Sequence, residues 1–325
     1  MNFIGRFVRL ATTALALGIP AGGVSADEYP SKAIRFVAPY PPGSVTDLLA
    51  RTIGQKLTES WKQPVLVENR GGGGSVIGTD IVAKAPPDGY TILMVAPDLA
   101  INQTLRSGLP YDAEKSFAPV ARLVFSPTVL CVHPSLPVNN LRELIAHAKS
   151  RPGRLSYASG GNATVGHLGM ELLKHMAGID MVHVPYKGTA AVVTAVLTGD
   201  VQVAFAQMST ARPQHAAGKL RVLAVASGTR SQAMPELPTV AEAGLPGFKA
   251  EVWFGVVAPA GTPGGIISRL SSEMGRIMRM PDVQKQLLPQ GIEPMTTTAE
   301  EFAAFLREEI VTWGELVKKT GARVD

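Results

Sequence analysis

The chain has 325 residues, of which 46% are hydrophobic and 18% charged, and its formal net charge is +5. This length and composition fit one large or two medium globular domains and exclude a low-complexity chain. The basic surplus is small and scattered, which does not indicate a nucleic-acid-binding protein.

The first 26 residues have the order of a secretory signal peptide. Arg6 and Arg9 precede a short apolar stretch at 11–19, and small residues follow as far as Ala26. We expect cleavage after Ala26 and export to the periplasm. The alternative, a membrane anchor, needs a longer apolar stretch, because a bilayer core is roughly 30 Å thick. The single cysteine, Cys131, lies in an apolar run and is interpreted as a buried structural thiol.

From residue 34 onward, short apolar runs alternate with helical patterns, which predicts an α/β fold with mostly parallel sheets. In the predicted helices at 141–149 and 164–176, apolar residues recur with the spacing of one helix face. After residue 264 the sequence predicts helices with no strand between them. The predicted strands are 34–38, 65–68, 91–96, 128–132, 155–159, 181–185, 201–206, 220–226 and 253–258.

Two strand-to-helix corners share one composition. "PYPPGSVTD" (39–47) follows the first predicted strand, and "SGGNATVGH" (159–167) follows another in the middle of the chain. The first four N–H groups of a helix have no internal acceptor, and small residues give a ligand access to them. The two corners therefore predict a bound anion. The alternative is that Thr46 and Thr164 are plain N-caps.

A third glycine-rich corner, "ENRGGGGSVIGTD" (68–80), is not a phosphate-binding loop, because Thr79 occupies the position where that motif needs lysine. We interpret it as a strand-to-helix turn near the rim of the site. Asp98 follows the strand predicted at 91–96. Its carboxylate is expected either to cap the next helix or to pair with a cationic or hydroxyl group of the ligand.

The sequence gives little support to an enzyme. None of its six histidines lies in a metal-binding motif, so we predict no metal, cofactor or catalytic residue. Ser159 and His167 could form a nucleophile and base, but the G-x-S-x-G motif and a placed acid are missing. His167 is expected to be a neutral hydrogen-bonding residue, because the helix dipole lowers the pKa of an imidazole in the first turn.

Many ordered motifs then resemble one family. They run from "YPSKAIRFVAPYPPGSVTDLLAR" through "VLVENRGGGGSVIGTDIVAKAPPDGYTILM" and "DMVHVPYKGTAAVVTAVLTGDVQVAFA" to the final "GARVD". The mature chain resembles the Bug-type periplasmic solute-binding receptors of tripartite tricarboxylate transporters. It departs from their usual pattern at Ser44, where a second glycine is common, and at Gln207, where many members have aspartate.

This resemblance implies a two-domain α/β protein of the type II periplasmic-binding-protein fold, with the ligand cleft between the domains. The first domain is expected at 27–127 and 254–325, and the second at 128–253. The implied ligand is a small carboxylate gripped between the two corners, and the implied partners are membrane subunits of a transporter that a monomeric receptor serves. The implied ligand-binding residues are Tyr40, Pro42, Gly43, Ser44, Val45, Thr46, Asp47, Asp98, Ser159, Gly161, Asn162, Ala163, Thr164, His167, Tyr186 and Gln207.

Two other functions stay open at this stage. The same receptor could be the ligand-sensing input of a membrane signalling protein, which the neighbouring genes would reveal. A serine hydrolase built on Ser159 and His167 would reveal itself by ester turnover.

The signal peptide gives a first testable prediction. Removing 26 of the 325 residues leaves a chain of 299 residues that begins at Asp27. The intact mass of protein from a periplasmic extract should match that chain, and a mass that includes Met1 would contradict the prediction.

Overall fold

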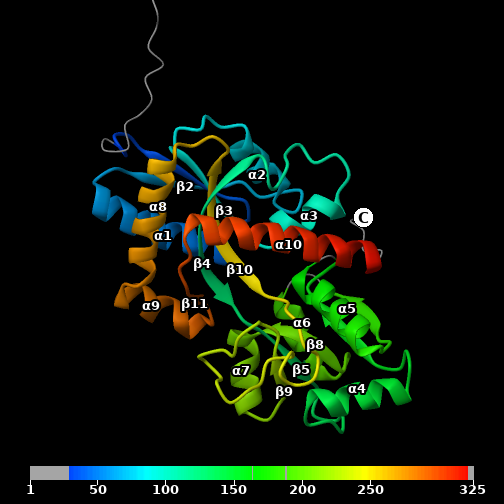
Figure 1. The fold of residues 1–325 in the computed structure, drawn as a ribbon. Coiled ribbons are helices and arrows are strands. Elements are labelled where there is room, and N and C mark those ends of the chain that lie inside the picture. Colours follow the sequence, from blue (N-terminus) through cyan, green and yellow to red (C-terminus); the bar gives the residue numbers. More distant parts are fainter. Residues whose placement is uncertain (1–28, 163, 187–188, 321–325) are drawn as a thin grey trace, which may run out of the picture.

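A computed structural model describes residues 29–162, 164–186 and 189–320 (Figure 1). Within these ranges the chain forms two mixed β-sheets with helices packed around each. The first sheet has the strand order β11-β4-β10-β3-β1-β2, in which β1 runs parallel to β2 and β3, and β10 runs antiparallel to β3 and β4. Its strands are β1 (Ile34–Ala38), β2 (Val65–Asn69), β3 (Thr91–Val95), β4 (Phe117–Ser126), β10 (Val252–Pro259) and β11 (Glu293–Pro294).

The second sheet is built from the middle of the chain and has the strand order β7-β6-β8-β5-β9. β6 runs parallel to β7 and β8, whereas β5 runs antiparallel to β8 and β9. Its strands are β5 (Thr128–Val132), β6 (Ser156–Ser159), β7 (Val182–Pro185), β8 (Val203–Gln207) and β9 (Arg221–Val225).

The helices alternate with these strands as the apolar periodicity predicts. The amphipathic helices bury one face in the core, as α4 does with Leu141, Leu144 and Ala148. No helix of the three described ranges is long and apolar enough to cross a membrane. The helices are α1 (Val45–Trp61), α2 (Val76–Ala83), α3 (Asp98–Leu105), α4 (Leu141–Ser150), α5 (Val165–Ala177), α6 (Thr189–Thr198), α7 (Met208–Ala216), α8 (Gly264–Met278), α9 (Pro281–Leu287), the 3₁₀ turn η1 (Leu288–Gln290) and α10 (Ala299–Thr320).

Three expectations about the sheets are wrong. Five of the nine strand pairings in the described residues are antiparallel, so the sheets are mixed rather than mostly parallel. β4 was not expected as a strand, and β11 lies between the C-terminal helices. The reason is long-range pairing: β4 and β10 each carry the chain between the sheets and pair along their length, which local periodicity does not encode.

The paired crossing strands determine the direction of the other strands. The chain leaves the first sheet through Pro127, between β4 and β5, and returns along β10, whose Val252 lies opposite Ser126. Because β3 is antiparallel to β10, β3 and its parallel neighbour β1 run toward this crossing. Because β8 is antiparallel to β5, β8 and its parallel neighbour β6 also run toward it. Each sheet therefore directs the carboxyl ends of its parallel strands toward the other sheet.

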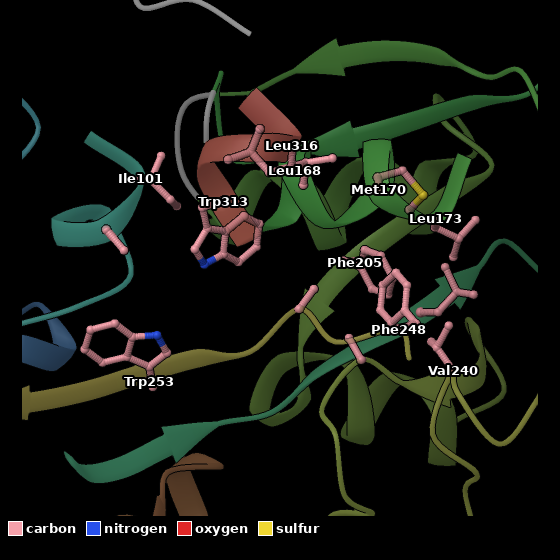
Figure 2. Close-up of a cluster of buried hydrophobic side chains, with 14 of the residues drawn as sticks. Ile101, Leu168, Met170, Leu173, Phe205, Val240, Phe248, Trp253, Trp313 and Leu316 are labelled. Atoms are coloured by element: carbon pink, nitrogen blue, oxygen red, sulfur yellow. The ribbon is translucent and has the colours of Figure 1, made fainter. Parts of the chain in front are cut away.

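Helix α10 packs against both halves of the molecule. Figure 2 shows Trp313 between Ile101 of α3 and Leu168 of α5, with Leu316 beside Leu168. These side chains belong to one buried apolar cluster that includes residues of both sheets. The hydrophobic core is therefore continuous across the crossing.

A buried carboxylate holds two tryptophans at this point. The indole N–H groups of Trp253 on β10 and Trp313 on α10 donate to the same Glu309 oxygen, at 2.7 and 2.8 Å. Burial raises the pKa of Glu309 above its usual value. The three side chains connect α10 to the strand that returns from the second sheet.

Glu309→Leu should therefore destabilise the protein, because it leaves two buried N–H groups without an acceptor. At about 1–3 kcal/mol for each of the two unsatisfied groups, we expect a loss of about 2–6 kcal/mol in the free energy of unfolding by urea. Glu309→Gln is the matched control, since its amide oxygen still accepts. Equal losses in the two variants would contradict this role of the hydrogen bonds.

Candidate ligand-binding site

The first corner connects β1 to α1 and is held by its own side chains. Ser44 is the N-cap and accepts from the Asp47 N–H at 3.3 Å, and its hydroxyl lies 2.8 Å from that of Thr46. The expectation that Thr46 might cap the helix is wrong: Thr46 is a buried residue of the first turn. Both residues are good caps two positions apart, so composition alone did not separate them.

The Asp47 side chain occupies one of the backbone N–H groups that we expected to bind the ligand. Its carboxylate accepts from the Gly43 N–H at 2.9 Å and forms an ion pair with Arg51 at 2.9 Å. Burial raises the pKa of Asp47, but these bonds outweigh burial and hold the pKa below its usual value. The N–H groups of Val45 and Thr46 remain, because they precede the first intrahelical bond of α1.

The second corner connects β6 to α5 in the same way. Thr164 is the N-cap, as one of the two alternatives predicted, and accepts from the His167 N–H at 3.3 Å. Its hydroxyl donates to the Gly161 carbonyl at 2.9 Å. Gly161 has φ +132°, a conformation that favours glycine. The first-turn N–H groups of Val165 and Gly166 have no intrahelical acceptor, and Ala163 lies outside the described residues.

Behind the second corner, three rings stack. His183 of β7 lies between Tyr157 of β6, at 4.9 Å between ring centroids, and His167 of α5, at 4.1 Å. The Ser159 hydroxyl lies 2.7 Å from His183 Nε2 and also bonds the backbone of Gly161. The histidine stack therefore supports the shape of the corner through Ser159.

Both histidines favour the neutral form. Burial lowers the pKa of His167, and burial together with the neighbouring His167 lowers the pKa of His183 to about 4. His167 was expected to be neutral because of the helix dipole, but burial is the larger cause in the structure. At the far end of the stack, the Tyr157 hydroxyl donates to Glu171 at 2.5 Å, and Lys174 pairs with the same carboxylate.

Asp98 joins three corners of the first sheet. Its carboxylate accepts from the hydroxyls of Tyr40, in the corner after β1, and Ser75, in the glycine-rich corner before α2. The expectation that Asp98 might cap α3 is wrong: Pro97 is the N-cap, and Asp98 makes no capping bond. Burial raises the pKa of Asp98 to about 6, and the two hydroxyls partly offset this effect.

The structure places the predicted residues in two groups. Residues 40–47 and Asp98 lie at the carboxyl ends of β1 and β3. Residues 159–162 and 164–167, Tyr186 and Gln207 lie at the carboxyl ends of β6, β7 and β8. Each group lies at the edge of its sheet that is directed toward the other sheet. A hollow of about 440 Å³ adjoins the first group and is lined by Gly43, Asp47, Leu48, Arg51, Thr52, Gln55, Gln286 and Gln290.

Sequence reasoning missed Ser75 and His183. Ser75 has φ +74°, where glycine is usual, and it follows four glycines. His183 alternates with apolar residues on β7, a pattern that also fits an ordinary edge strand. Neither pattern shows which residue the side chain bonds, because Ser75 and Asp98 are 23 positions apart in sequence and Ser159 and His183 are 24 positions apart.

The hydrolase alternative is not supported by this geometry. Ser159 bonds His183 rather than His167, and its side chain is fully buried. His183 is a weak base, since its pKa is about 4. The three described ranges contain no group of three or more His, Cys, Asp or Glu residues that could hold a metal ion.

Comparison with known proteins agrees with this arrangement. A family model described as the tripartite tricarboxylate transporter family receptor matches residues 49–322. Protein BugT of Bordetella pertussis is 37% identical over 306 residues, which cover 94% of each chain.

Three solved structures are similar over nearly their whole length. R. palustris Rpa4515 with adipate has 33% identity and a TM-score of 0.75, covering 91% of this chain and 99% of that one. MatC from Rhodopseudomonas palustris with bound malate has 30% identity and a TM-score of 0.72, with coverages of 89% and 100%. The periplasmic binding protein BugD has 31% identity and a TM-score of 0.72, with coverages of 91% and 99%.

The histidine stack predicts a loss of stability in acid. A His pKa near 4 in the folded state and about 6.5 in the unfolded state gives stability that is present above pH 6.5 and lost as the pH falls toward 4. The melting temperature of His183→Gln should therefore fall less between pH 7 and 4.5 than that of the wild type. His175→Gln, at an exposed position of α5, is the control and should follow the wild type.

Proposed function

We propose that this chain, which belongs to the tripartite tricarboxylate transporter receptor family, captures a small carboxylate in the periplasm and delivers it to the membrane subunits of such a transporter. The observation that carries the proposal is the placement of two N-capped helix starts at sheet edges that are directed toward each other. Each offers N–H groups without an intrahelical acceptor, and each lies where the helix dipole favours an anion.

The related structures support a carboxylate as the ligand class. Adipate and malate, which two of them contain, both carry a carboxylate at each end. In this chain one carboxylate would bind the first turn of α1 and a carboxylate or other polar group would bind the first turn of α5. At the first corner, Arg51 is paired with Asp47. Backbone amides and hydroxyls, together with water, would hold the ligand.

Closure of two bodies would complete the site. We take residues 27–127 with 254–325 as one body and 128–253 as the other, connected through Pro127 and the start of β10. The ligand binds one corner first, and the second corner then closes over it, because the anion interacts with both helix starts only in the closed form. The receptor acts without chemistry on the ligand, as a monomer, and is exported by the signal peptide at 1–26.

Binding should depend on the charge of the ligand. Malate, adipate, benzoate and glutamate form the test panel, and calorimetry measures each affinity. For the tightest of them, the neutral amide should bind at least ~30-fold more weakly, because charge-assisted hydrogen bonds contribute about 1.5–3 kcal/mol each. Equal affinities of acid and amide would overturn the proposal, as would the absence of binding by any acid.

A glycine pair tests the second corner separately. Gly161→Val should abolish binding of the same acid, because the new side chain stands beside the exposed amides of the corner. Gly178→Val is the matched control, since Gly178 ends the same helix with φ +60° and open space around it. Both variants introduce a strained backbone, so equal losses of affinity would mean that the second corner does not contact the ligand.

A further inference from the structure

Asp98 carries a charge that opposes an anionic ligand. The Tyr40 hydroxyl that bonds it belongs to the same corner as the first turn of α1. β1 and β3 are parallel neighbours, so Tyr40 and Asp98 both follow strands that end at the same edge of the first sheet. A carboxylate bound at the first turn of α1 would therefore lie at the same sheet edge as the carboxylate of Asp98.

The groups around Asp98 leave that charge without an ion pair in the described part of the chain. Tyr40 faces it from the corner after β1, Ser75 from the start of α2, and Tyr111 from the segment after α3. The positive charge of Arg106, the residue that follows α3, acts to lower the pKa of Asp98, and the Arg106 Nε donates to Asn102 at 3.0 Å. Within the described residues, no lysine or arginine nitrogen lies within 4 Å of the Asp98 carboxylate.

The two hydroxyls that hold Asp98 suit either protonation state. A carboxylate accepts both hydrogen bonds, and a protonated carboxyl still accepts one while it donates its own proton to the other hydroxyl, because serine and tyrosine hydroxyls donate or accept. Tyr40 and Ser75 can therefore stay in place when Asp98 becomes neutral. The negative charge of Asp98 can therefore be removed while the conformation of the corner stays the same.

We propose that Asp98 takes up a proton from solvent when a carboxylate binds, so that the receptor favours anionic ligands that bind together with a proton. This inference rests on the proposed function. In it, Asp98 determines which ligand charge the receptor prefers. A ligand with an ammonium group near Asp98 would instead keep the carboxylate ionised.

The sign of the pH dependence follows from linkage. In the free protein the pKa of Asp98 is about 6, and a second negative charge nearby raises it further. Below pH 6 Asp98 is already neutral, so the affinity reaches a plateau. Above pH 6 binding must draw a proton from solvent, and the affinity falls by up to about tenfold for each pH unit until the pH reaches the pKa of the complex.

The test titrates malate, adipate, benzoate and glutamate into the wild type, Asp98→Asn and Ser75→Gly by calorimetry at pH 6, 7 and 8. The wild type should bind its tightest non-amine acid at least about fivefold more weakly at pH 8 than at pH 6. Asp98→Asn, which keeps the side-chain size and removes the charge, should change by less than about twofold and should bind at pH 8 as tightly as the wild type does at pH 6.

Ser75→Gly tests the same group without changing it. The replacement fits the positive φ of Ser75 and removes one donor that stabilises the ionised form. The pKa of Asp98 should rise, so the plateau should extend to higher pH. Titrations at pH 7.5 in buffers of low and high ionisation enthalpy should show about 0.5–1 proton taken up per malate in the wild type and close to none in Asp98→Asn.

The outcomes separate this inference from the proposed function. Binding of an acid with equal affinity at pH 6 and 8 overturns the inference alone. A pH dependence of the affinity that persists in Asp98→Asn also overturns it, because another group would then take up the proton. Tighter binding of glutamate that is lost in Asp98→Asn would show pairing with an amine and overturn it as well. Failure of all four acids to bind at any pH overturns the proposed function and the inference with it.

Discussion

The antiparallel pairing of β4 with β10 is the constraint on which the site depends. These two strands carry the chain out of the first sheet and back, and Val252 lies opposite Ser126 at the crossing. Once their directions are fixed, the parallel pairs β1/β3 and β6/β8 must end toward the crossing. Two ordinary strand-to-helix corners, 120 residues apart in sequence, are thereby directed toward one another.

The same crossing limits how the two halves can move. α10 packs on α3 and α5, and the Glu309 carboxylate joins it to Trp253 on the returning strand. A second contact between the halves lies at the short strand β11, where the buried Glu293 accepts from Ser231 and from the Gln232 N–H. The proposed closure would have to keep or exchange these contacts, as expected for a hinge whose sides are packed.

The sequence predicted the local parts of the fold and missed what depends on distant partners. Apolar periodicity located α4 and α5 within a residue or two, and the small polar corners after β1 and β6 were recognised from composition. The strand β4 and the mixed sheets were missed because the antiparallel pairing of β4 with β10 joins residues 126 to 142 positions apart in sequence, from Val252 with Ser126 to Pro259 with Phe117. At the site, residue type suggested Asp98, but only the fold shows its bonds to Tyr40 and Ser75.

The charges near the two corners explain why a capped helix start alone does not identify an anion-binding site. At the first corner Asp47 already supplies a carboxylate, which takes the Gly43 amide and is neutralised by Arg51. Asp98 adds a second carboxylate close by, with hydroxyl partners and no ion pair in the described part of the chain. We therefore expect the helix dipole at the first corner to be weakened by the charge of Asp98, which the charge of Arg106 offsets in part. Within the described residues, no carboxylate bonds the start of α5, and Glu171 lies at the far end of the ring stack, where it is paired with Lys174. If both corners bind the anion as proposed, the second corner would attract it more strongly, and this attraction would favour the proposed closure.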